Sequence, residues 1–261
     1  RMIQEERFDI VHCHGSRANM IGAILKRTIN VPIVTTVHSD YRLDYLGRPF
    51  HRLTYGTINT ISLRMFDYHI GVSDAMVQLL ISRGFNPQKL FSIYNGVAFP
   101  PEKPSLSRGE YLESLCVSYD EDTVVFGIAA RLNPVKDIAT LIRGFAGACR
   151  KCPNIRLVIA GDGEERQMLE SLAKETCPAG SVVFAGWVKD TDSFYHAIDV
   201  NMLTSLSEGA PYALVEGARM RCATIATSVG GIPYMMESGV TGLLFTPRDV
   251  ETLTSYMVRL V

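Results

Sequence analysis

Short apolar runs alternate with segments of helical periodicity along almost the whole chain. Most of the runs lack the regular alternation of apolar and polar residues, which is typical of parallel strands covered on both faces. Between them, apolar residues recur at the spacing of amphipathic helices. We predict strands at Asp9–His12, Ile33–Val37, His69–Val72, Phe91–Tyr94, Val124–Ala130, Arg156–Ala160, Val182–Ala185, Val200–Leu203 and Thr224–Thr227. We predict helices at Ser16–Arg27, Asp74–Arg83, Ile138–Arg150, Glu164–Lys174 and Ala213–Met220.

The alternation of strand and helix predicts an α/β protein with parallel sheets and right-handed crossovers. The proline-rich segment Phe99–Pro104 interrupts it, because such a segment fits neither a helix nor a central strand. A short helix follows, opened by Ser107 and Glu110 as a capping box. We therefore divide the chain into a domain at 1–98, a linker with a short helix at 99–120 and a domain at 121–261. Only four predicted strands precede the linker, so we expect the first domain to be truncated.

Composition narrows the class of protein. The 261 residues are 47% hydrophobic and 20% charged, with 26 basic and 27 acidic side chains. A net charge of −1 gives no reason to expect a nucleic-acid partner, which needs a concentrated basic surface. No run approaches the ~18 apolar residues of a membrane span, and no signal peptide is recognisable. We expect a cytoplasmic protein and leave peripheral association with the inner face of the membrane open.

The spacing of the six cysteines does not indicate a disulfide framework. Cys149 and Cys152 are a lone CxxC pair, which fits a redox pair or half of a zinc site. No second CxxC or HxxxH completes a zinc site, so ordinary reduced thiols are favoured.

Polar clusters follow the predicted strands, where parallel sheets bind their ligands. Ser207–Glu216 comes after the strand that ends at Leu203. In this segment Gly209 allows close backbone approach, and Pro211 suits the first turn of a helix. The free N–H groups of that turn would seat a phosphate. Two carboxylates, Glu208 and Glu216, are placed to hold sugar and ribose hydroxyls; the alternative is that both are ordinary helix and surface residues.

Two cations follow an earlier predicted strand. Arg131 and Lys136 come directly after Val124–Ala130, and a diphosphate leaving group gains negative charge as its bond to a sugar breaks. Each cation placed about 4 Å from a phosphate charge would contribute about 4 kcal/mol of Coulomb attraction at an effective dielectric constant near 20, before the cost of desolvation. Taken alone, such a pair is more often a pair of surface charges.

Glycines mark two further loops. Gly161–Arg166 opens a helix after a strand, but Arg166 occupies the sixth position of the G-x-G-x-x-G dinucleotide motif, which argues against an oxidoreductase. The loop still offers Gly163 and a helix N-terminus to a nucleoside or phosphate, although a plain turn explains it as well. Gly230 and Gly231 form a similar turn.

Histidines gather at strand ends in the first domain. His12 and His14 lack a third ligand of suitable spacing, so a metal is not expected. His38 is the better functional candidate, with a loop hydrogen bond as the alternative. Asp190 and Asp192 form a DxD, which we interpret as a helix start with Asp192 as N-cap.

Taken in order, these motifs resemble the GT-B glycosyltransferases of family 4, also called glycosyl transferases group 1. The matching segments are DIVHCHG (9–15), TTVHSD (35–40), GVSDAM (71–76), YNGV (94–97), ARLNPVKD (130–137), LVIAGDGEE (157–165), SEGAPYALVEG (207–217), TSVGGIP (227–233) and GVTGLLF (239–245).

The resemblance implies two Rossmann-like domains facing a cleft, with the acceptor on 1–98 and the donor nucleotide-sugar on 121–261. It implies that Arg131 and Lys136 hold the donor diphosphate. Glu216 would bind the ribose, Glu208 would face the donor sugar, and His38 would lie by the reacting centre. The implied donor-binding residues are Gly163, Gly209, Ala210, Pro211, Tyr212, Ala213, Leu214 and Glu216, and the implied acceptor-side residues are His14 and Gly15.

The implied reaction is a retaining sugar transfer without metal or cofactor. The donor is a UDP- or GDP-sugar, and the acceptor is a glycan, a lipid-linked molecule or a small molecule. Two alternatives stay open: a non-catalytic nucleotide-sugar-binding subunit of a glycan assembly, and a GT-B epimerase or phosphorylase.

The chain departs from the family pattern at several glycines. Arg221 and Ala223 replace the glycine and proline of a Gly-x-Pro, and Ala130 and Asp137 stand where glycine is common. A left-handed Arg221 would cost roughly 1 kcal/mol or more, so we expect a strained or rearranged turn there.

Overall fold

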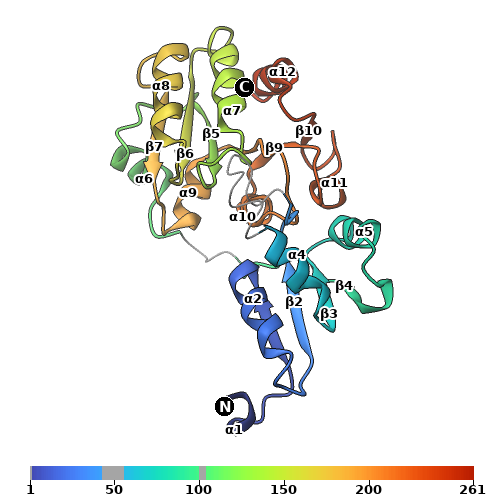
Figure 1. The fold of residues 1–261 in the computed structure, drawn as a ribbon. Helices are drawn as coiled ribbons and strands as arrows, with labels where there is room; N and C mark the ends of the chain where they lie inside the picture. Colours follow the sequence, from blue (N-terminus) through green and yellow to red (C-terminus); the bar gives the residue numbers. More distant parts are fainter. Residues whose placement is uncertain (1, 43–55, 100–103) are drawn as a thin grey trace. The chain divides into compact units, whose positions relative to one another are not determined.

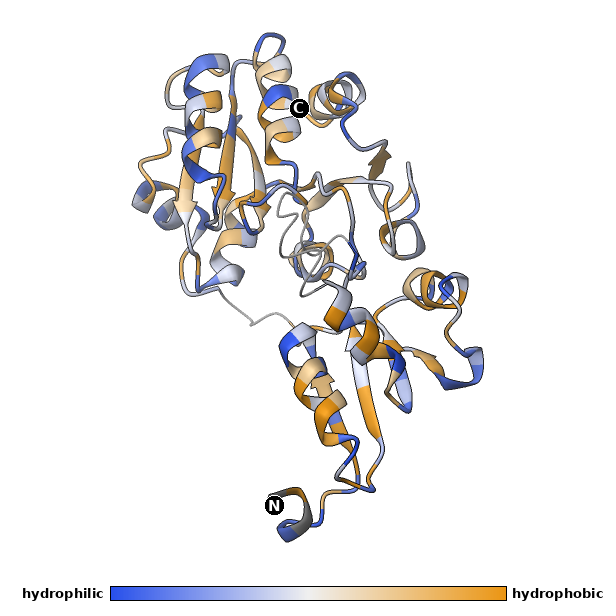
Figure 2. Cartoon of the chain, viewed as in Figure 1, coloured by the Kyte–Doolittle hydropathy of each residue, from blue (hydrophilic) through white to orange (hydrophobic). Residues whose placement is uncertain are grey.

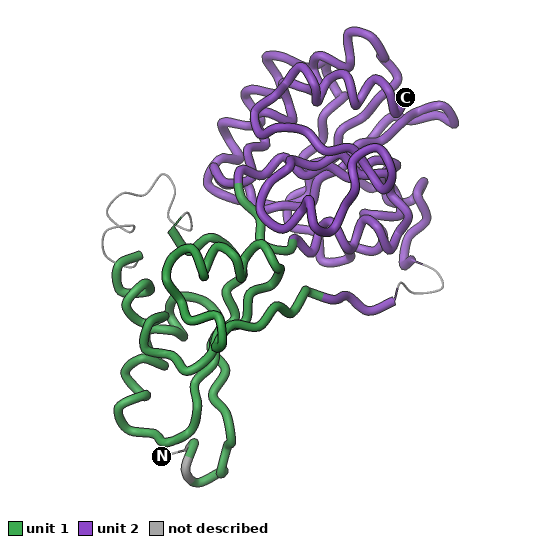
Figure 3. Tube along the Cα trace, turned by 90° about the vertical axis from the view of Figure 1, so that its right-hand side faces the viewer, with its two compact units in different colours: residues 1–95, 207–210 green, residues 96–206, 211–261 purple. Residues whose placement is uncertain are grey.

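The computed structural model describes residues 2–42, 56–99 and 104–261. They form two compact units, one of 1–95 with 207–210 and one of 96–206 with 211–261 (Figure 3). Within the linker and short helix predicted at 99–120, residues 100–103 lie outside the described residues. Each unit is a parallel sheet with helices, which confirms the predicted α/β class with two Rossmann-like domains.

The first unit contains a four-stranded sheet in the order β1-β2-β3-β4, with all strands parallel (Figure 1). The elements of this unit that lie within 2–42 and 56–99 are α1 (Met2–Glu5), β1 (Val11–His14), α2 (Gly15–Leu25), β2 (Ile33–Val37), α4 (Thr57–Arg64), β3 (Tyr68–Gly71), α5 (Asp74–Ser82), the 3-10 helix η2 (Pro87–Lys89) and β4 (Leu90–Ser92).

The core of the first unit lies between the strands and these helices. Leu63 of α4 and Leu80 of α5 are fully or almost fully buried, and both belong to the cluster that contains Val37 of β2. Helix α2 approaches β1 closely because it has Gly22, whose added Cβ would lie 2.8 Å from the sulfur of Cys13. Helix α5 begins at Ser73, whose hydroxyl accepts a hydrogen bond from the Met76 amide.

The second unit contains a six-stranded parallel sheet in the order β10-β9-β8-β5-β6-β7. Its elements are α6 (Arg108–Ser114), β5 (Val124–Ala129), α7 (Ile138–Cys149), β6 (Ile155–Ala160), α8 (Arg166–Thr176), β7 (Val182–Gly186), α9 (Thr191–Ala197), β8 (Val200–Leu203), α10 (Tyr212–Arg219), β9 (Ala223–Thr227), α11 (Ile232–Met235), β10 (Leu243–Phe245) and α12 (Val250–Arg259).

Both faces of this sheet are buried, as the continuous apolar runs predict. Phe126 of β5 packs into the cluster that contains α7, α8 and α12, whereas its neighbour Val125 packs into the cluster of α6 and α9. In Figure 2 the strands β5 and β6 are hydrophobic between helices that carry hydrophilic residues. The sheet is therefore a rigid support for the loops at its strand ends.

Helices α7 and α12 pack closely because α7 presents glycines to its partner. A Cβ at Gly144 would lie 2.7 Å from Leu253, and one at Gly147 would lie 2.6 Å from the hydroxyl of Thr254. That hydroxyl also donates a hydrogen bond to the Gly144 carbonyl. Among the described residues, no helix has both the length and the apolar character needed to cross a membrane.

Candidate functional site

The strand order of the second unit reverses between β5 and β8. From β5 the chain proceeds outward to β6 and β7, then returns to place β8 on the other side of β5. In open parallel sheets, ligands bind beyond the carboxyl ends of the strands at such a switch point. The segments that contain Arg131, Lys136 and Gly163 all begin at this edge.

The loops that follow β5 and β6 are joined through their backbones. The Leu132 amide donates a hydrogen bond to the Asp162 carbonyl at 3.0 Å, and the Glu165 amide donates to the Leu132 carbonyl at 3.1 Å. This contact needs a glycine at position 163, where a Cβ would lie 2.2 Å from the Leu132 carbonyl oxygen. The backbone around exposed Arg131 is therefore held in one place.

The loop after β8 holds the other end of the β5 loop. The Leu206 amide donates to the Val135 carbonyl at 2.7 Å, and the buried Thr204 hydroxyl donates to the carbonyl of half-buried Lys136 at 2.9 Å. Asp137 then begins α7 in the left-handed conformation (φ 46°), where the family commonly has glycine. The loop that contains both cations is thus fixed from the two neighbouring strands.

Helix α10 lies tightly against β8. Its Gly217 leaves room for the Asn201 side chain, whose Nδ2 would be 2.4 Å from an added Cβ and donates to the Ala213 carbonyl. Pro211 is the N-cap of this helix, one residue before the first turn in which the sequence analysis placed it. The cause is its extended backbone (φ −68°, ψ 126°), which suits a cap.

Glu216, on α10, lies close to the buried ring of Tyr195 on α9. Burial raises the pKa of Tyr195, and the negative charge of Glu216 raises that pKa further. Glu216 is half-buried, so it is not a fully exposed surface residue. Its predicted contact with a ribose stays a prediction.

The turn after α10 keeps the geometry that glycine usually provides. Arg221 is left-handed (φ 64°). The Cys222 amide donates to the Gly217 carbonyl, and the Arg221 amide donates to the Ala218 carbonyl, each at 3.0 Å. These are the two hydrogen bonds of a Schellman motif. The left-handed backbone on which the expected strain depends is present at Arg221, and the turn is not rearranged.

The predicted N-cap of α9 was wrong by two residues. Asp190, not Asp192, caps this helix, and its carboxylate accepts hydrogen bonds from the Ser193 amide at 3.1 Å and hydroxyl at 2.7 Å. Asp192 instead pairs with Arg219 of α10, which also donates to the Ala98 carbonyl. Both aspartates fit a cap by residue type, so only the position of the first helical turn decides between them.

No group of three histidine, cysteine or acidic side chains within 2–42, 56–99 and 104–261 is arranged to hold a metal ion. The six cysteines are free thiols. Burial raises the pKa of Cys149 to about 11, which makes it a poor nucleophile. Catalysis without a metal stays a prediction.

Three histidines meet at the carboxyl edge of the sheet in the first unit. His12 and His14 point to one side of β1 because they are two residues apart. The register pairs His14 with Thr36 of β2, and the Thr36 hydroxyl lies 2.8 Å from His12 Nε2. His14 Nδ1 lies 3.0 Å from His38 Nε2. The rings of His12 and His14 are 4.2 Å apart between centroids.

The surroundings of His38 favour a neutral imidazole. Desolvation lowers the pKa of His38, and the neighbouring His14 and His12 lower it further. Within the same compact unit, a Cβ at Gly209 would lie 2.2 Å from the His38 carbonyl oxygen, and Asn95 Nδ2 donates to the Ala210 carbonyl at 2.7 Å. The segment 207–210, which includes Glu208, is therefore held beside the backbone of His38.

The structure thus separates the predicted residues into two groups. Arg131, Lys136 and Gly163 lie in joined loops of the second unit, whose helix α10 contains Glu216. His14, Gly15 and His38 belong to the first unit, together with the segment that contains Glu208. Their convergence on a single donor pocket stays a prediction. Sequence reasoning missed Thr204 and Tyr195, because nothing in the sequence indicates which loops and helices they contact.

Two family models match the chain. The model described as Glycosyl transferases group 1 matches residues 123–261, and Glycosyltransferase Family 4 matches residues 1–99. The chain belongs to the glycosyl transferases group 1 family. The identification made from the motifs is confirmed. The chain is a glycosyltransferase in sequence and fold.

Two relatives illustrate this membership of the glycosyl transferases group 1. The Escherichia coli UDP-Gal:alpha-D-GlcNAc-diphosphoundecaprenol alpha-1,3-galactosyltransferase is 25% identical over 99% of the chain and 68% of its own length. An uncharacterized glycosyltransferase of Methanocaldococcus jannaschii is 29% identical over 95% of the chain. The chain spans 65% of the length of that archaeal relative, so the activity of a whole protein is a matter for proposal.

Solved structures confirm the GT-B fold. Anabaena HepE in complex with UDP-glucose superposes with a TM-score of 0.81 at 23% identity, over 98% of the chain and 69% of HepE. Sucrose-phosphate synthase from Thermosynechococcus elongatus superposes with a TM-score of 0.82 at 21% identity, over 99% of the chain and 65% of that protein.

Proposed function

We propose that the protein transfers a sugar from a nucleotide diphosphate sugar to an acceptor, with retention of configuration and without a metal ion. One observation carries the proposal: the loop with Arg131 and Lys136 is held by backbone hydrogen bonds between the loops of β6 and β8, at the switch point of the sheet. Two cations fixed at that edge suit a diphosphate whose charge grows as the sugar leaves.

We propose roles for the other residues that are consistent with their positions. Glu216, half-buried on α10, is proposed to bind the ribose, and the backbone at Gly163 to face the nucleoside or phosphate. Glu208 and His38 are proposed to face the donor sugar and the reacting centre. The relatives support a UDP-sugar over a GDP-sugar, because HepE forms a complex with UDP-glucose and the E. coli relative uses UDP-Gal.

The acceptor class is proposed from one of the same relatives. The E. coli relative acts on a sugar attached to diphosphoundecaprenol, which supports a lipid-linked acceptor over a free glycan or a small molecule. A lipid-linked acceptor would bring the protein to the inner membrane surface from the cytoplasm.

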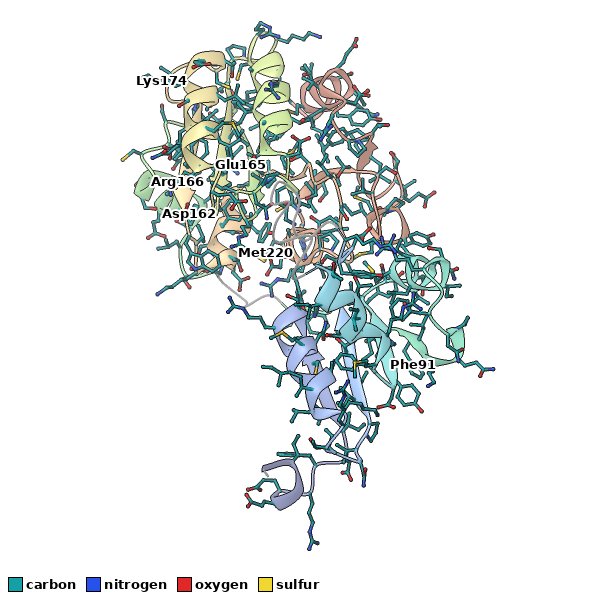
Figure 4. The ribbon with its side chains drawn as sticks, in the orientation of Figure 1. Phe91, Asp162, Glu165, Arg166, Lys174 and Met220 are labelled. Atoms are coloured by element: carbon teal, nitrogen blue, oxygen red, sulfur yellow. The ribbon has the colours of Figure 1, made fainter. Side chains whose placement is uncertain are left out.

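The decisive experiment replaces Lys136 by alanine. Transfer from UDP-glucose or UDP-galactose should fall on the order of 100-fold or more, as when one preorganised electrostatic group is removed. Lys174→Ala is the matched control, because Lys174 is exposed at the far end of α8 from Asp162 and Arg166 (Figure 4). Equal transfer rates in the two variants would refute the role of Lys136.

Further measurements separate the alternatives. Retention is read from the anomeric configuration of the product, and metal independence from activity in excess EDTA. An epimerase changes the donor in the absence of acceptor, whereas a phosphorylase needs phosphate. A non-catalytic subunit would be stabilised by UDP-sugar, by about 2.7 kcal/mol at 100 times its dissociation constant, and yet transfer nothing.

A further inference from the structure

The histidine cluster on β1 and β2 contains a contact for which the proposed function gives no role. His14 Nδ1 lies 3.0 Å from His38 Nε2, a hydrogen-bond distance, and the two rings are tilted by 31° with centroids 5.3 Å apart. Two imidazoles form such a bond only when one nitrogen carries a proton and the other presents a lone pair. The bond therefore couples the tautomer of His38 to that of His14.

We propose that His14 is a positioning residue, which fixes the ring orientation and the tautomer of His38 through this hydrogen bond. The inference rests on the proposed function, in which His38 lies at the reacting centre. A histidine that acts on a substrate must present the correct ring nitrogen, and the partner of its other nitrogen determines which one that is. With Nε2 engaged by His14, His38 has Nδ1 left for a reacting molecule.

The surroundings of His14 fit this role. Its own ring is held in place by His12, whose centroid is 4.2 Å away and whose Nε2 is hydrogen-bonded to the Thr36 hydroxyl. Thr36 is 8% exposed and belongs to β2, so the arrangement is anchored in the sheet. The strand register supplies the geometry, since β1 places His14 directly beside Thr36, two residues before His38.

The same contact keeps a second positive charge away from His38. Two imidazolium ions cannot share one hydrogen bond, because both nitrogens would then be donors. Asp40, which follows His38 in the sequence, does not supply a compensating charge, because its carboxylate is paired with Arg83. At most one of the two rings can therefore carry a positive charge while this hydrogen bond is present.

The test compares three replacements by their effect on the ring nitrogens of His38. Asparagine places a polar side-chain atom where histidine has Nδ1, so His14→Asn keeps the hydrogen bond. His14→Phe keeps a ring of similar size and removes the bond. His196→Asn is the matched control, because His196 is exposed on α9 of the other unit.

The primary measurement is 15N NMR of selectively labelled histidine, which needs no activity. Wild type, His14→Asn and His196→Asn should show one dominant tautomer of His38, and His14→Phe should show a mixture. An unchanged tautomer population in His14→Phe would overturn the proposal, whether or not the protein transfers sugar.

Kinetics provide the second measurement in an active preparation. His14→Phe should lower kcat roughly two- to tenfold, the range that corresponds to one neutral hydrogen bond, with the donor KM unchanged. His14→Asn should restore kcat. Failure of Asn to restore it, together with a rise in donor KM, would show that His14 contacts substrate itself and would contradict the positioning role. If no variant transfers sugar while the tautomer result holds, the proposed function fails and the coupling of the two histidines stands.

Discussion

Arg221→Gly tests whether the left-handed turn after α10 stores strain. Arg221 is exposed, has φ 64°, and occupies the C′ position of the Schellman motif. A Cβ in the left-handed region costs about 1–2 kcal/mol. The greater freedom of glycine in the unfolded chain offsets roughly 0.5–1 kcal/mol of this. The favourable interaction of a cation with a helix C-terminus, about 0.3–1 kcal/mol, is also lost with Arg221.

A comparison of alanine with glycine at position 221 isolates the backbone effect, because neither residue carries a charge. Relative to Arg221→Ala, Arg221→Gly should raise the free energy of unfolding by about 0.5–1 kcal/mol. At the neighbouring exposed Ala218, inside α10, Ala218→Gly should lower it by about the same amount. The same chemical change is thus expected to have opposite signs three residues apart.

Urea unfolding at 25 °C, followed by far-UV circular dichroism, measures both effects as shifts of the midpoint at constant m-value. Fluorescence is the poorer probe, because the single Trp187 is 77% exposed. If glycine destabilises both positions relative to alanine, the turn stores no strain, and the argument from φ is refuted.

Three other predictions concern the second unit. Gly163→Ala forces a Cβ to 2.2 Å from the Leu132 carbonyl and should weaken UDP-sugar binding at least about tenfold by calorimetry. Gly180→Ala places its Cβ in open space, and although its left-handed φ of 76° should lower stability, the affinity should stay unchanged. Arg108→Lys replaces the two-point pairing with Asp199, in which each hydrogen bond is 2.8 Å long, by a single ammonium group and should cost about 2 kcal/mol of unfolding free energy. The exposed Arg143→Lys should cost less than about 0.5 kcal/mol. The side-chain and backbone hydrogen bonds from Ser193 lower the pKa of Asp190. The stability that this carboxylate contributes is therefore present above the ordinary pKa of an aspartate, about 3.9, and is lost as the pH falls through the lowered pKa of the folded state. In Asp190→Asn the free energy of unfolding should therefore fall less steeply between about pH 5 and pH 2 than in the wild type. An unchanged dependence on pH in this range would contradict the stabilising role of the Asp190 carboxylate.

Long apolar runs were predicted well from the sequence, and short elements were not. The strand expected at Val124–Ala130 is β5 at Val124–Ala129, because a buried parallel strand has no polar residue inside it. The first strand was expected at Asp9–His12 and lies at Val11–His14, because the polar residues that follow it resemble a loop. Helix α4 was missed because its threonines and isoleucines have weak helical propensity. Strand β10 was missed because it has only three residues.

The sequence indicated which residue types form the candidate site, but it did not indicate how those residues are arranged in space. Arg131 and Lys136 could be selected because cations after a buried strand fit a diphosphate. Their fixation by Thr204 could not be predicted, since it depends on β8 lying beside β5. The contact between His14 and His38 likewise depends on the register of β1 and β2, which a period of two residues does not specify.

The neighbouring strands β5 and β8 come from separate stretches of the chain, with α7, β6, α8, β7 and α9 synthesised between them. The sheet is therefore two halves, β5-β6-β7 and β8-β9-β10, joined along one seam with two paired positions, Phe126 with Val200 and Gly127 with Asn201. A nucleotide seated over this seam would touch loops from both halves and clamp them together. Its binding energy would then add to the work of pulling the halves apart, so the amide hydrogens of β8 would exchange more slowly in its presence.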